Sequence, residues 1–311
     1  MATSDPAPAD RALRPDRGLL RLRGVSGRLG GPGAPLRRPW HQRADDRLAR
    51  EEAVSGRGPA PPAGRVLEVL VAAPTVRVER IELAGGGRAV RKIYSLPRFG
   101  QRLRLAFGPG WLGRPKGERE ADNLRRLHRG GAAAPPPLAA GSRRDRLGFV
   151  RQSWLLLPDL SPRPTLAEVL AGRAPVPTAF ADRERLWQAV GASVADIHRL
   201  GCFYRDLRAR NLLLGEGDLF WIDAAKSRWA KPPLAAAAAA LDLAGFVLPL
   251  DLPPSAWSAL IAGYGAFTDL ERPQQLSRLL GRRRRRRLAR VLAREAQRQS
   301  AGRNPVRIDG P

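Results

Sequence analysis

The most informative part of the sequence is residues 197–228, which read IHRLGCFYRDLRARNLLLGEGDLFWIDAAKSR. The stretch opens as the end of an amphipathic helix, and Gly201 suits the left-handed conformation in which many helices end. A polar loop follows and carries Asp206 and Asn211, which are five residues apart. The two short apolar runs LLL and LFWI then flank a GEGD turn and predict a β-hairpin, after which the chain reaches Asp223.

The predicted hairpin would bring Asn211 and Asp223 side by side at the ends of adjacent strands. Amide and carboxylate oxygens suit Mg²⁺, which binds through a few protein groups and keeps several waters, so both residues are candidate metal ligands. Asp206, on the same loop, would face an acceptor hydroxyl as the catalytic base. Phosphoryl transfer needs these groups, together with a cation on the nucleotide phosphates. The separation of seventeen residues between Asp206 and Asp223 matches the catalytic and metal-binding loops of protein kinases.

Lys92, in the sequence VRKIY, is the candidate for this cation, because it lies on the third of three predicted strands, where kinases hold a phosphate-binding lysine. Only four of the 55 basic residues are lysines, so a lysine at this position is informative. A compact ammonium and a broad guanidinium are not interchangeable in a confined pocket. The expected partner of Lys92 is Glu120. Glu118 lies two residues away, and either carboxylate is also explained as a surface charge that the helix dipole favours.

The pattern around these residues predicts an α+β fold. RVLEVLVA, VRVERIEL and RAVRKIY read as three antiparallel strands, and GEREADNLRRLHRGG reads as a helix that packs on them. LGFVRQ and SWLLLP are predicted as two further strands that end at Pro158, after which helical periodicity dominates. The expected architecture is a protein-kinase-like bilobal fold. Its N-lobe, residues 63–158, would hold a small antiparallel β-sheet with one helix, and its C-lobe, residues 159–299, would be mainly helical.

The two ends of the chain show no pattern that predicts a folded element. Glycine and proline make up 18 of the first 64 residues, and neither strand nor helix periodicity is sustained there. Residues 1–62 are therefore predicted to be disordered, because they cannot bury enough apolar surface to offset their ordering entropy. A start assigned upstream of the true one is the other explanation of this segment. Residues 300–311 are predicted to be a flexible tail.

With these motifs, the chain resembles the lipopolysaccharide kinase family, the kinase-like enzymes that phosphorylate Kdo or heptose sugars of the lipopolysaccharide inner core. The resemblance covers roughly residues 76–228. It rests on VRKIY, the arginine-rich insert that ends in GEREADNLRRLHRGGAAAPPPLA, the segment IHRLGCFYRDLRARNLLL, and WIDAAKSR. The resemblance implies ATP as the phosphoryl donor with Mg²⁺, Lys92 and Glu120 as the nucleotide-positioning pair, Asp206 as base, and Asn211 and Asp223 at the metal.

Three features depart from the usual kinase pattern. Tyr204 stands where most kinases have histidine. The sequence DAA at Asp223–Ala225 replaces Asp-Phe-Gly, which argues against activation by a mobile phenylalanine. No G-x-G-x-x-G loop lies between the first two predicted strands, so the phosphates must be covered by residues 74–77, PTVR, or by another segment.

Two polar residues are predicted to be structural. The apolar stretch 234–250 is short for a membrane span, and its charged Asp242 would be costly to place in a bilayer. The stretch therefore predicts a buried helix that contains Asp242. A buried carboxylate needs hydrogen-bond donors, and the backbone of the Asp206 loop is the expected source. His198 is expected to be a capping or packing histidine.

The formal net charge of +26 would normally indicate a nucleic-acid or membrane partner. The arginines are spread along the whole chain, and the tryptophans show no stacking periodicity, so no specific nucleic acid is expected as a partner. The run Arg282–Arg287 leaves two interpretations open, a solvated helix face or peripheral contact with the anionic inner face of a membrane. The single cysteine, Cys202, and an N-terminus that mixes charge with proline favour the cytoplasm.

The primary functional hypothesis is an ATP-dependent kinase that phosphorylates a sugar hydroxyl in the lipopolysaccharide inner core or a related envelope glycolipid. A kinase for another small molecule or for protein would share the same catalytic residues, because acceptor contacts come from variable loops. The alternative from another class is an inactive kinase-fold scaffold that binds a membrane or nucleic acid through its positive charge. The complete set of Lys92, Asp206, Asn211 and Asp223 argues against the scaffold, which has no need for these residues.

Overall fold

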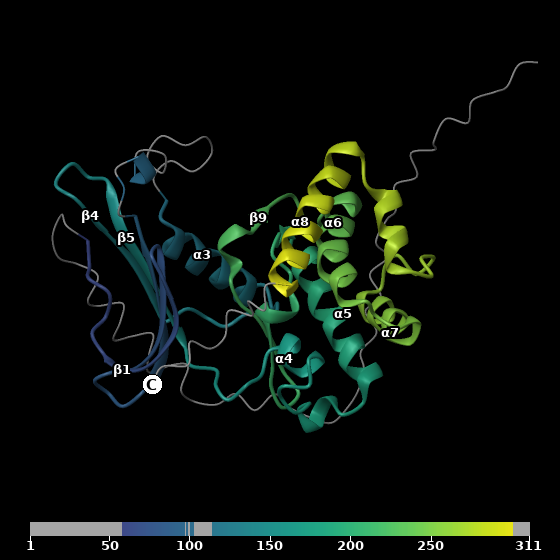
Figure 1. Cartoon of the computed structure of the whole chain (residues 1–311), viewed down its shortest axis with the longest axis horizontal. Helices are drawn as coiled ribbons and strands as arrows, with labels where there is room; N and C mark the ends of the chain where they lie inside the picture. Colours follow the sequence, from purple (N-terminus) through teal and green to yellow (C-terminus); the bar gives the residue numbers. More distant parts are fainter. Residues whose placement is uncertain (1–57, 97, 99, 103–113, 301–311) are drawn as a thin grey trace, which may run out of the picture. The chain divides into compact units, whose positions relative to one another are not determined.

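The computed structural model describes residues 58–96, 98, 100–102 and 114–300 (Figure 1). A five-stranded antiparallel sheet comes first, with the strand order β1-β2-β3-β5-β4. Its members are β1 (Arg65–Ala73), β2 (Val76–Glu82), β3 (Arg88–Ser95), β4 (Ala139–Arg144) and β5 (Val150–Pro158). The first three strands are those predicted from sequence, and the sheet together with the helices described below confirms the predicted α+β class. The predicted lobe boundary at Pro158 coincides with the end of β5 and stays a prediction.

The sequence-based prediction is wrong for one pair of strands. LGFVRQ and SWLLLP contribute to a single strand, β5, whose neighbour β4 has the unpredicted sequence AAGSRR. Asp145 turns the chain between them, because its Oδ1 accepts hydrogen bonds from the backbone N–H groups of Leu147 and Phe149. Alanine and glycine are depleted in strands, and β4 contains no β-branched or aromatic residue, so it gives no sequence signal. Its glycine is required by packing, since a Cβ at Gly141 would lie 2.8 Å from the ring of Trp154.

Helix α3 (Lys116–Arg129) packs on this sheet. Leu124 and Leu127, which the sequence places on one helical face, are both fully buried. The first turn lies so close to β5 that a Cβ at Gly117 would be 2.6 Å from the backbone oxygen of Trp154. The predicted helix is therefore present, and its small first-turn residue allows the close approach to the sheet.

The chain after β5 is mainly helical. Its helices are α4 (Leu166–Leu170), α5 (Arg183–Arg199), α6 (Ala236–Val247), α7 (Pro254–Tyr264) and α8 (Arg282–Ser300). Short strands pair as β6 (Cys202–Phe203) with β9 (Arg228–Trp229) and as β7 (Leu212–Leu214) with β8 (Leu219–Trp221). Glycine lets α5 and α7 pack closely, because a Cβ at Gly191 would lie 2.0 Å from the backbone oxygen of Leu260. Figure 1 shows α8, at the end of the described chain, beside α6.

The apolar stretch 234–250 forms α6 and a short 3₁₀ helix, Leu248–Leu250. Most of α6 is buried, including Leu243 and Phe246, so the predicted buried helix is present. A membrane span would need a longer apolar helix than any that the described part of the chain contains.

Most of the segment predicted to be disordered, residues 1–62, lies outside the described residues, as does most of the predicted tail. Residues 58–62 are described and make contacts with the sheet, while the disorder of residues 1–62 stays a prediction. The backbone oxygen of Pro59 accepts a hydrogen bond from Trp154 Nε1 at 3.1 Å, and that of Pro62 accepts one from Arg91 Nη1 at 2.7 Å. These two backbone hydrogen bonds, which no sequence pattern predicts, attach this short stretch to the sheet.

Candidate active site

Lys92 lies on β3, and its ammonium contacts Glu120 of α3. Lys92 Nζ donates a hydrogen bond to Glu120 Oε1 at 2.7 Å, and the glutamate side chain is fully buried. Tyr94, two residues further along β3, donates its phenolic hydrogen to Glu120 Oε2 at 2.6 Å. Alternate residues of a strand share a face, which explains why both side chains reach one carboxylate. The predicted partner of Lys92 is thus in contact with it.

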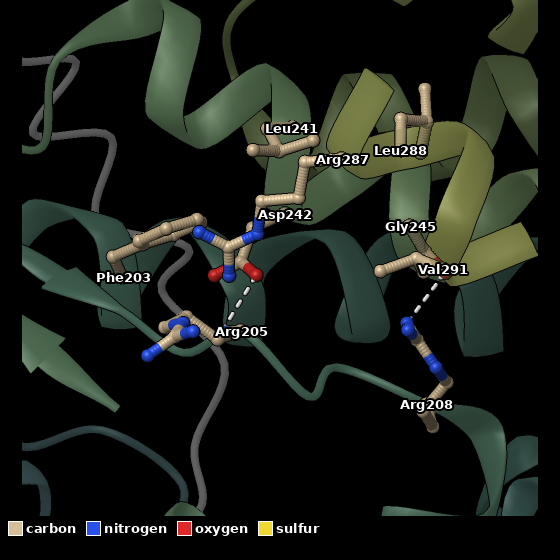
Figure 2. Close-up of a pocket in the computed structure, with 9 residues that line it drawn as sticks. All are labelled: Phe203, Arg205, Arg208, Leu241, Asp242, Gly245, Arg287, Leu288 and Val291. Atoms are coloured by element: carbon tan, nitrogen blue, oxygen red, sulfur yellow. Dashed lines mark hydrogen bonds between the residues drawn. The ribbon is translucent and has the colours of Figure 1, made fainter. Parts of the chain in front are cut away.

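The loop that carries Asp206 is held by Asp242 of α6. The Asp242 carboxylate accepts a hydrogen bond from the backbone N–H of Tyr204 at 2.6 Å. It accepts a second one from the backbone N–H of Arg205 at 2.7 Å (Figure 2). Arg205 adopts a left-handed φ of 70°, a conformation that costs a non-glycine residue about 1 kcal/mol or more. His198 is buried next to this carboxylate, with 3.5 Å between its Nε2 and Oδ2 of the aspartate. The expected structural hydrogen bonds to Asp242 are therefore present.

Asp206 is buried, and a lysine contacts its carboxylate. Lys226 Nζ donates to Asp206 Oδ2 at 2.6 Å, and Arg210 Nη2 lies 4.0 Å from Oδ1. Asn211 braces the same loop, because its Nδ2 donates to the backbone oxygen of Asp206 at 2.9 Å. This bond engages the amide nitrogen of Asn211 and leaves its side-chain oxygen as the group that would meet a metal ion.

The β7–β8 hairpin brings Asn211 and Asp223 to the same end of two paired strands, as the sequence predicts. The ladder continues one step beyond the strands, through a hydrogen bond from the Ile222 N–H to the backbone oxygen of Asn211 at 2.9 Å. Asp223 then turns away with the left-handed angles φ 65° and ψ 51°. Tyr204 donates its phenolic hydrogen to the backbone oxygen of Ile222 at 2.9 Å. The residue that replaces the usual histidine therefore ties the Asp206 loop to the strand end before Asp223.

Charges link Asp223 to the Lys92 region. Burial acts to raise the pKa of Asp223, but the nearby Lys92, Lys116 and Lys226 ammonium groups outweigh it and hold this pKa below its usual value. Burial acts to lower the pKa of Lys92, but Glu120 and then Asp223 outweigh it, so this pKa is raised. Both shifts favour the charged forms, an aspartate and an ammonium.

Direct hydrogen bonds also join α3 to the segment that follows β8. Arg119 Nε donates to the backbone oxygen of Ala225 at 2.8 Å, and Asn123 Nδ2 donates to that of Ala224 at 2.8 Å. Both donors flank Glu120 on the helix. The structure therefore brings all five predicted site residues into one connected region.

Sequence reasoning does not single out Lys116 and Lys226, although both lie beside the candidate residues. Lys116 Nζ lies 4.2 Å from the centre of the Tyr94 ring, and Lys226 contacts Asp206 as described above. The composition could have indicated both residues, because lysine is rare in this chain. Of its four lysines, three lower the pKa of Asp223, and Lys231 does not belong to this group. The rarity of lysine, which makes Lys92 informative, applies equally to Lys116 and Lys226.

Comparison with protein families gives the decisive observation. A model of the lipopolysaccharide kinase (Kdo/WaaP) family matches residues 87–264, more than half of the chain, and this range includes every predicted site residue. This chain belongs to the lipopolysaccharide kinase family. Its predicted membership and its predicted class, a phosphotransferase, are confirmed. Membership of a kinase family implies ATP as the phosphoryl donor.

Solved structures similar to this lipopolysaccharide kinase family member include WaaP in complex with acyl carrier protein. That match has 20% identity and a TM-score of 0.47, and it covers 77% of this chain and 89% of the other. Another is the PknI kinase domain of Mycobacterium tuberculosis, with 18% identity and a TM-score of 0.41, covering 78% of this chain and 100% of the other. A search of curated proteins gives no match.

Proposed function

We propose that this kinase transfers the γ-phosphate of ATP to a sugar hydroxyl, of Kdo or heptose, in the lipopolysaccharide inner core or a related envelope glycolipid. Family membership supports the reaction class and the general nature of the acceptor. The observation that carries the proposal is the convergence of the buried Lys92–Glu120 pair, the Asp206 loop and Asp223 in one hydrogen-bonded region.

Asp206 is the proposed base. As the acceptor oxygen bonds to the γ-phosphorus, the bond from this phosphorus to the β–γ bridging oxygen breaks, and the hydroxyl proton passes to the Asp206 carboxylate. Lys226, at 2.6 Å, holds the carboxylate in position, and the Asn211 side chain holds the backbone oxygen of the same residue. Because Lys226 is half exposed, its ammonium also adds positive charge beside the reacting groups.

Asn211 and Asp223 fit a magnesium ion that arrives with the nucleotide. Their donor set is one carboxylate, kept ionised by the surrounding ammonium groups, and one amide oxygen whose nitrogen is already engaged. Within the described residues no three His, Cys, Asp or Glu side chains cluster as a metal site, so a closed protein-only site does not compete with this assignment. Such an ion, when bound, neutralises phosphate charge, and one or two carboxylates with phosphates and waters are its usual ligands.

Lys92 is the proposed contact for the α- and β-phosphates, with Glu120 as the residue that positions it. Tyr94 supports the role, because its hydrogen bond occupies the second carboxylate oxygen and fixes the glutamate. Lys116 is close to the same group of charges and offers a second ammonium to the phosphates. It is a candidate for the contacts that a glycine-rich loop makes in other kinases.

The proposed place of the reaction is the cytoplasmic side of the inner membrane, where ATP and a growing glycolipid meet. Arg282–Arg286 support peripheral contact with this anionic surface, because all five lie exposed at the start of α8.

Incubation with labelled ATP and candidate acceptors tests the proposal. We expect magnesium-dependent transfer to Kdo-lipid A or to heptosylated core, and none to a protein substrate. Transfer to protein but not to sugar would refute the acceptor assignment. Nucleotide binding by calorimetry, with and without Mg²⁺, provides the second measurement, since the absence of metal-dependent binding would favour an inactive scaffold.

A further inference from the structure

A cavity of about 410 Å³ lies beside Asp206. Ten residues line the cavity, and those from Arg287 onwards belong to helix α8. They are Arg205, Asp206, Arg208, Lys226, Arg287, Arg290, Val291, Arg294, Glu295 and Arg298. Seven of these ten side chains are cationic and two are acidic, so the wall is strongly positive. The volume lies within the range of roughly 300 to 1,000 Å³ that is typical of small-molecule sites.

The cavity differs from the proposed nucleotide site in its lining. Asp206 and Lys226 belong to both, whereas Lys92, Asn211 and Asp223 do not line the cavity. A molecule in the cavity would therefore meet the proposed base without displacing the groups that hold the nucleotide. This is the position that an acceptor must occupy.

One face of α8 supplies the arginines. Arg287, Arg290, Arg294 and Arg298 are spaced by three or four residues, which places them along the same side of the helix. The last three are exposed, whereas Arg287 is partly buried with its guanidinium 4.9 Å from the centre of the Phe203 ring. Figure 2 shows Arg287 on α8 near Arg205 of the catalytic loop.

Glu295 anchors this helix face to the catalytic loop. Its Oε1 accepts a hydrogen bond from Arg210 Nη1 at 2.5 Å, and its Oε2 lies 3.5 Å from Arg208 Nε. The arginine face is thus fixed relative to Asp206 through the residues that follow it in the loop.

The cavity lining has more cationic side chains than acidic side chains that could pair with them. Across the described residues, Arg205, Arg287, Arg290 and Arg294 form no salt bridge to an acidic side chain. The Nε atoms of Arg205 and Arg208 are buried, and neither has a hydrogen-bond partner in the described structure. Burial first, and then the neighbouring Arg287 and Arg228, lower the pKa of Arg205. Unsatisfied donors and crowded like charges are the conditions that a bound anion relieves.

We propose that this cavity is the acceptor site, and that the α8 arginines bind carboxylate or phosphate groups that flank the acceptor hydroxyl. The inference rests on the proposed function and adds the chemistry of recognition: the acceptor is a polyanionic sugar, positioned by its anionic substituents. Planar guanidinium forks suit both carboxylate and phosphate. The exposed Arg282–Arg286 at the start of the helix do not line the cavity and have no part in this site.

Binding without ATP tests the inference separately from catalysis. The probe is a deacylated, water-soluble Kdo–glucosamine oligosaccharide that carries two phosphates, compared by calorimetry with the same oligosaccharide after phosphatase treatment. The test variant combines Arg290→Gln, Arg294→Gln and Arg298→Gln. The matched control combines Arg282→Gln, Arg284→Gln and Arg286→Gln, which removes three exposed charges from the same helix outside the cavity. Vesicles of phosphatidylglycerol and phosphatidylcholine form the second arm.

We expect the test variant to bind the phosphorylated probe roughly tenfold or more weakly than the wild type, because three charge pairs are lost, while the control changes little. Equal binding by the two variants, or no dependence on the probe's phosphates in the wild type, would overturn the inference. Weaker vesicle binding by the test variant with unchanged oligosaccharide binding would also overturn it and assign the face to the membrane. Phosphate-dependent binding without transfer to any sugar would refute the proposed function and leave the anion site in place.

Discussion

Two groups of cations meet at Asp206, and they differ in residue type, burial and partners. On one side Lys92, Lys116 and Lys226 surround Asp223, and two of them form short ion pairs with buried carboxylates, at 2.7 and 2.6 Å. On the other side the arginines of α8 line a cavity and are largely exposed.

The difference indicates two kinds of recognition in one site. A compact ammonium fits a confined space between carboxylates and phosphates, whereas a guanidinium presents a planar fork to an anion that arrives from solution. In a chain with 55 basic residues and so few lysines, we expect the three lysines around Asp223 to mark positions where an arginine does not fit. We therefore read the lysine group as the phosphoryl-donor side and the arginine face as the acceptor side.

Asp206→Asn removes the proposed base, which both sides share, and should have the largest effect. We expect turnover to fall by about a hundredfold to ten-thousandfold or more, the usual contribution of a general base. The affinity for ATP should change little, because the carboxylate acts when the acceptor oxygen attacks. Transfer of labelled phosphate and nucleotide calorimetry measure the two quantities. Near-native turnover with the true acceptor would refute the catalytic assignment.

Asp223→Ala should damage the lysine side in a different way. We expect a loss of roughly a hundredfold, about 3 kcal/mol, in magnesium-dependent nucleotide binding, together with lost turnover. The physical reason is that a direct metal ligand is removed and three ammonium groups lose their common carboxylate. Titration of nucleotide at several Mg²⁺ concentrations checks this. A variant with unchanged metal dependence would exclude Asp223 as a ligand.

Lysine-to-arginine substitutions test the difference between the two groups of cations directly, because they keep the positive charge and change the shape of the group that carries it. Lys92→Arg and Lys226→Arg should each lower turnover roughly tenfold, the cost of one misplaced charged hydrogen bond. Lys231→Arg is the matched control, since this exposed lysine lies outside the group around Asp223. Steady-state kinetics of the three variants provide the measurement. Full activity in all of them would show that the residue type carries no information.

Deletion of the N-terminal segment should have the smallest effect, because the sequence of residues 1–57 has no pattern that could support either group of cations. Melting temperature and turnover should stay nearly unchanged. Deletion of residues 1–62 instead removes the backbone oxygens bonded to Trp154 and Arg91, at about 1 kcal/mol per hydrogen bond, and should lower the melting temperature. A large loss on the shorter deletion would show that residues 1–57 contribute to the folded enzyme.

The sequence predicts the candidate site well where the information is local. Asp206, Asn211 and Asp223 lie within one loop and hairpin, so their spacing alone places them together. Lys92 and Glu120 are 28 residues apart, and their pairing was expected from the kinase pattern of a lysine on the third strand and a glutamate on the following helix, with Glu118 as the open alternative.

The remaining features depend on contacts that no local pattern encodes. Glu295 meets Arg210 across 85 residues of sequence, and periodicity does not say which face of α8 would turn toward the catalytic loop. The sequence-based prediction missed strand β4, because its pairing with β5 stabilises a segment whose residues seldom form strands. Lys226 follows Asp223 by three residues, yet its contact with Asp206 depends on the 3₁₀ turn at Ala224–Lys226.

The hydrogen bonds from α3 to Ala224 and Ala225 have a consequence for how the enzyme responds over time. The helix that carries Glu120 cannot swing outward without breaking the bonds from Arg119 and Asn123. Because these bonds already seat the helix, we expect no slow activation step, and product should accumulate linearly from the first seconds after mixing with ATP and acceptor. The rate of phosphorylation would then depend on the amount of enzyme and the supply of unmodified acceptor.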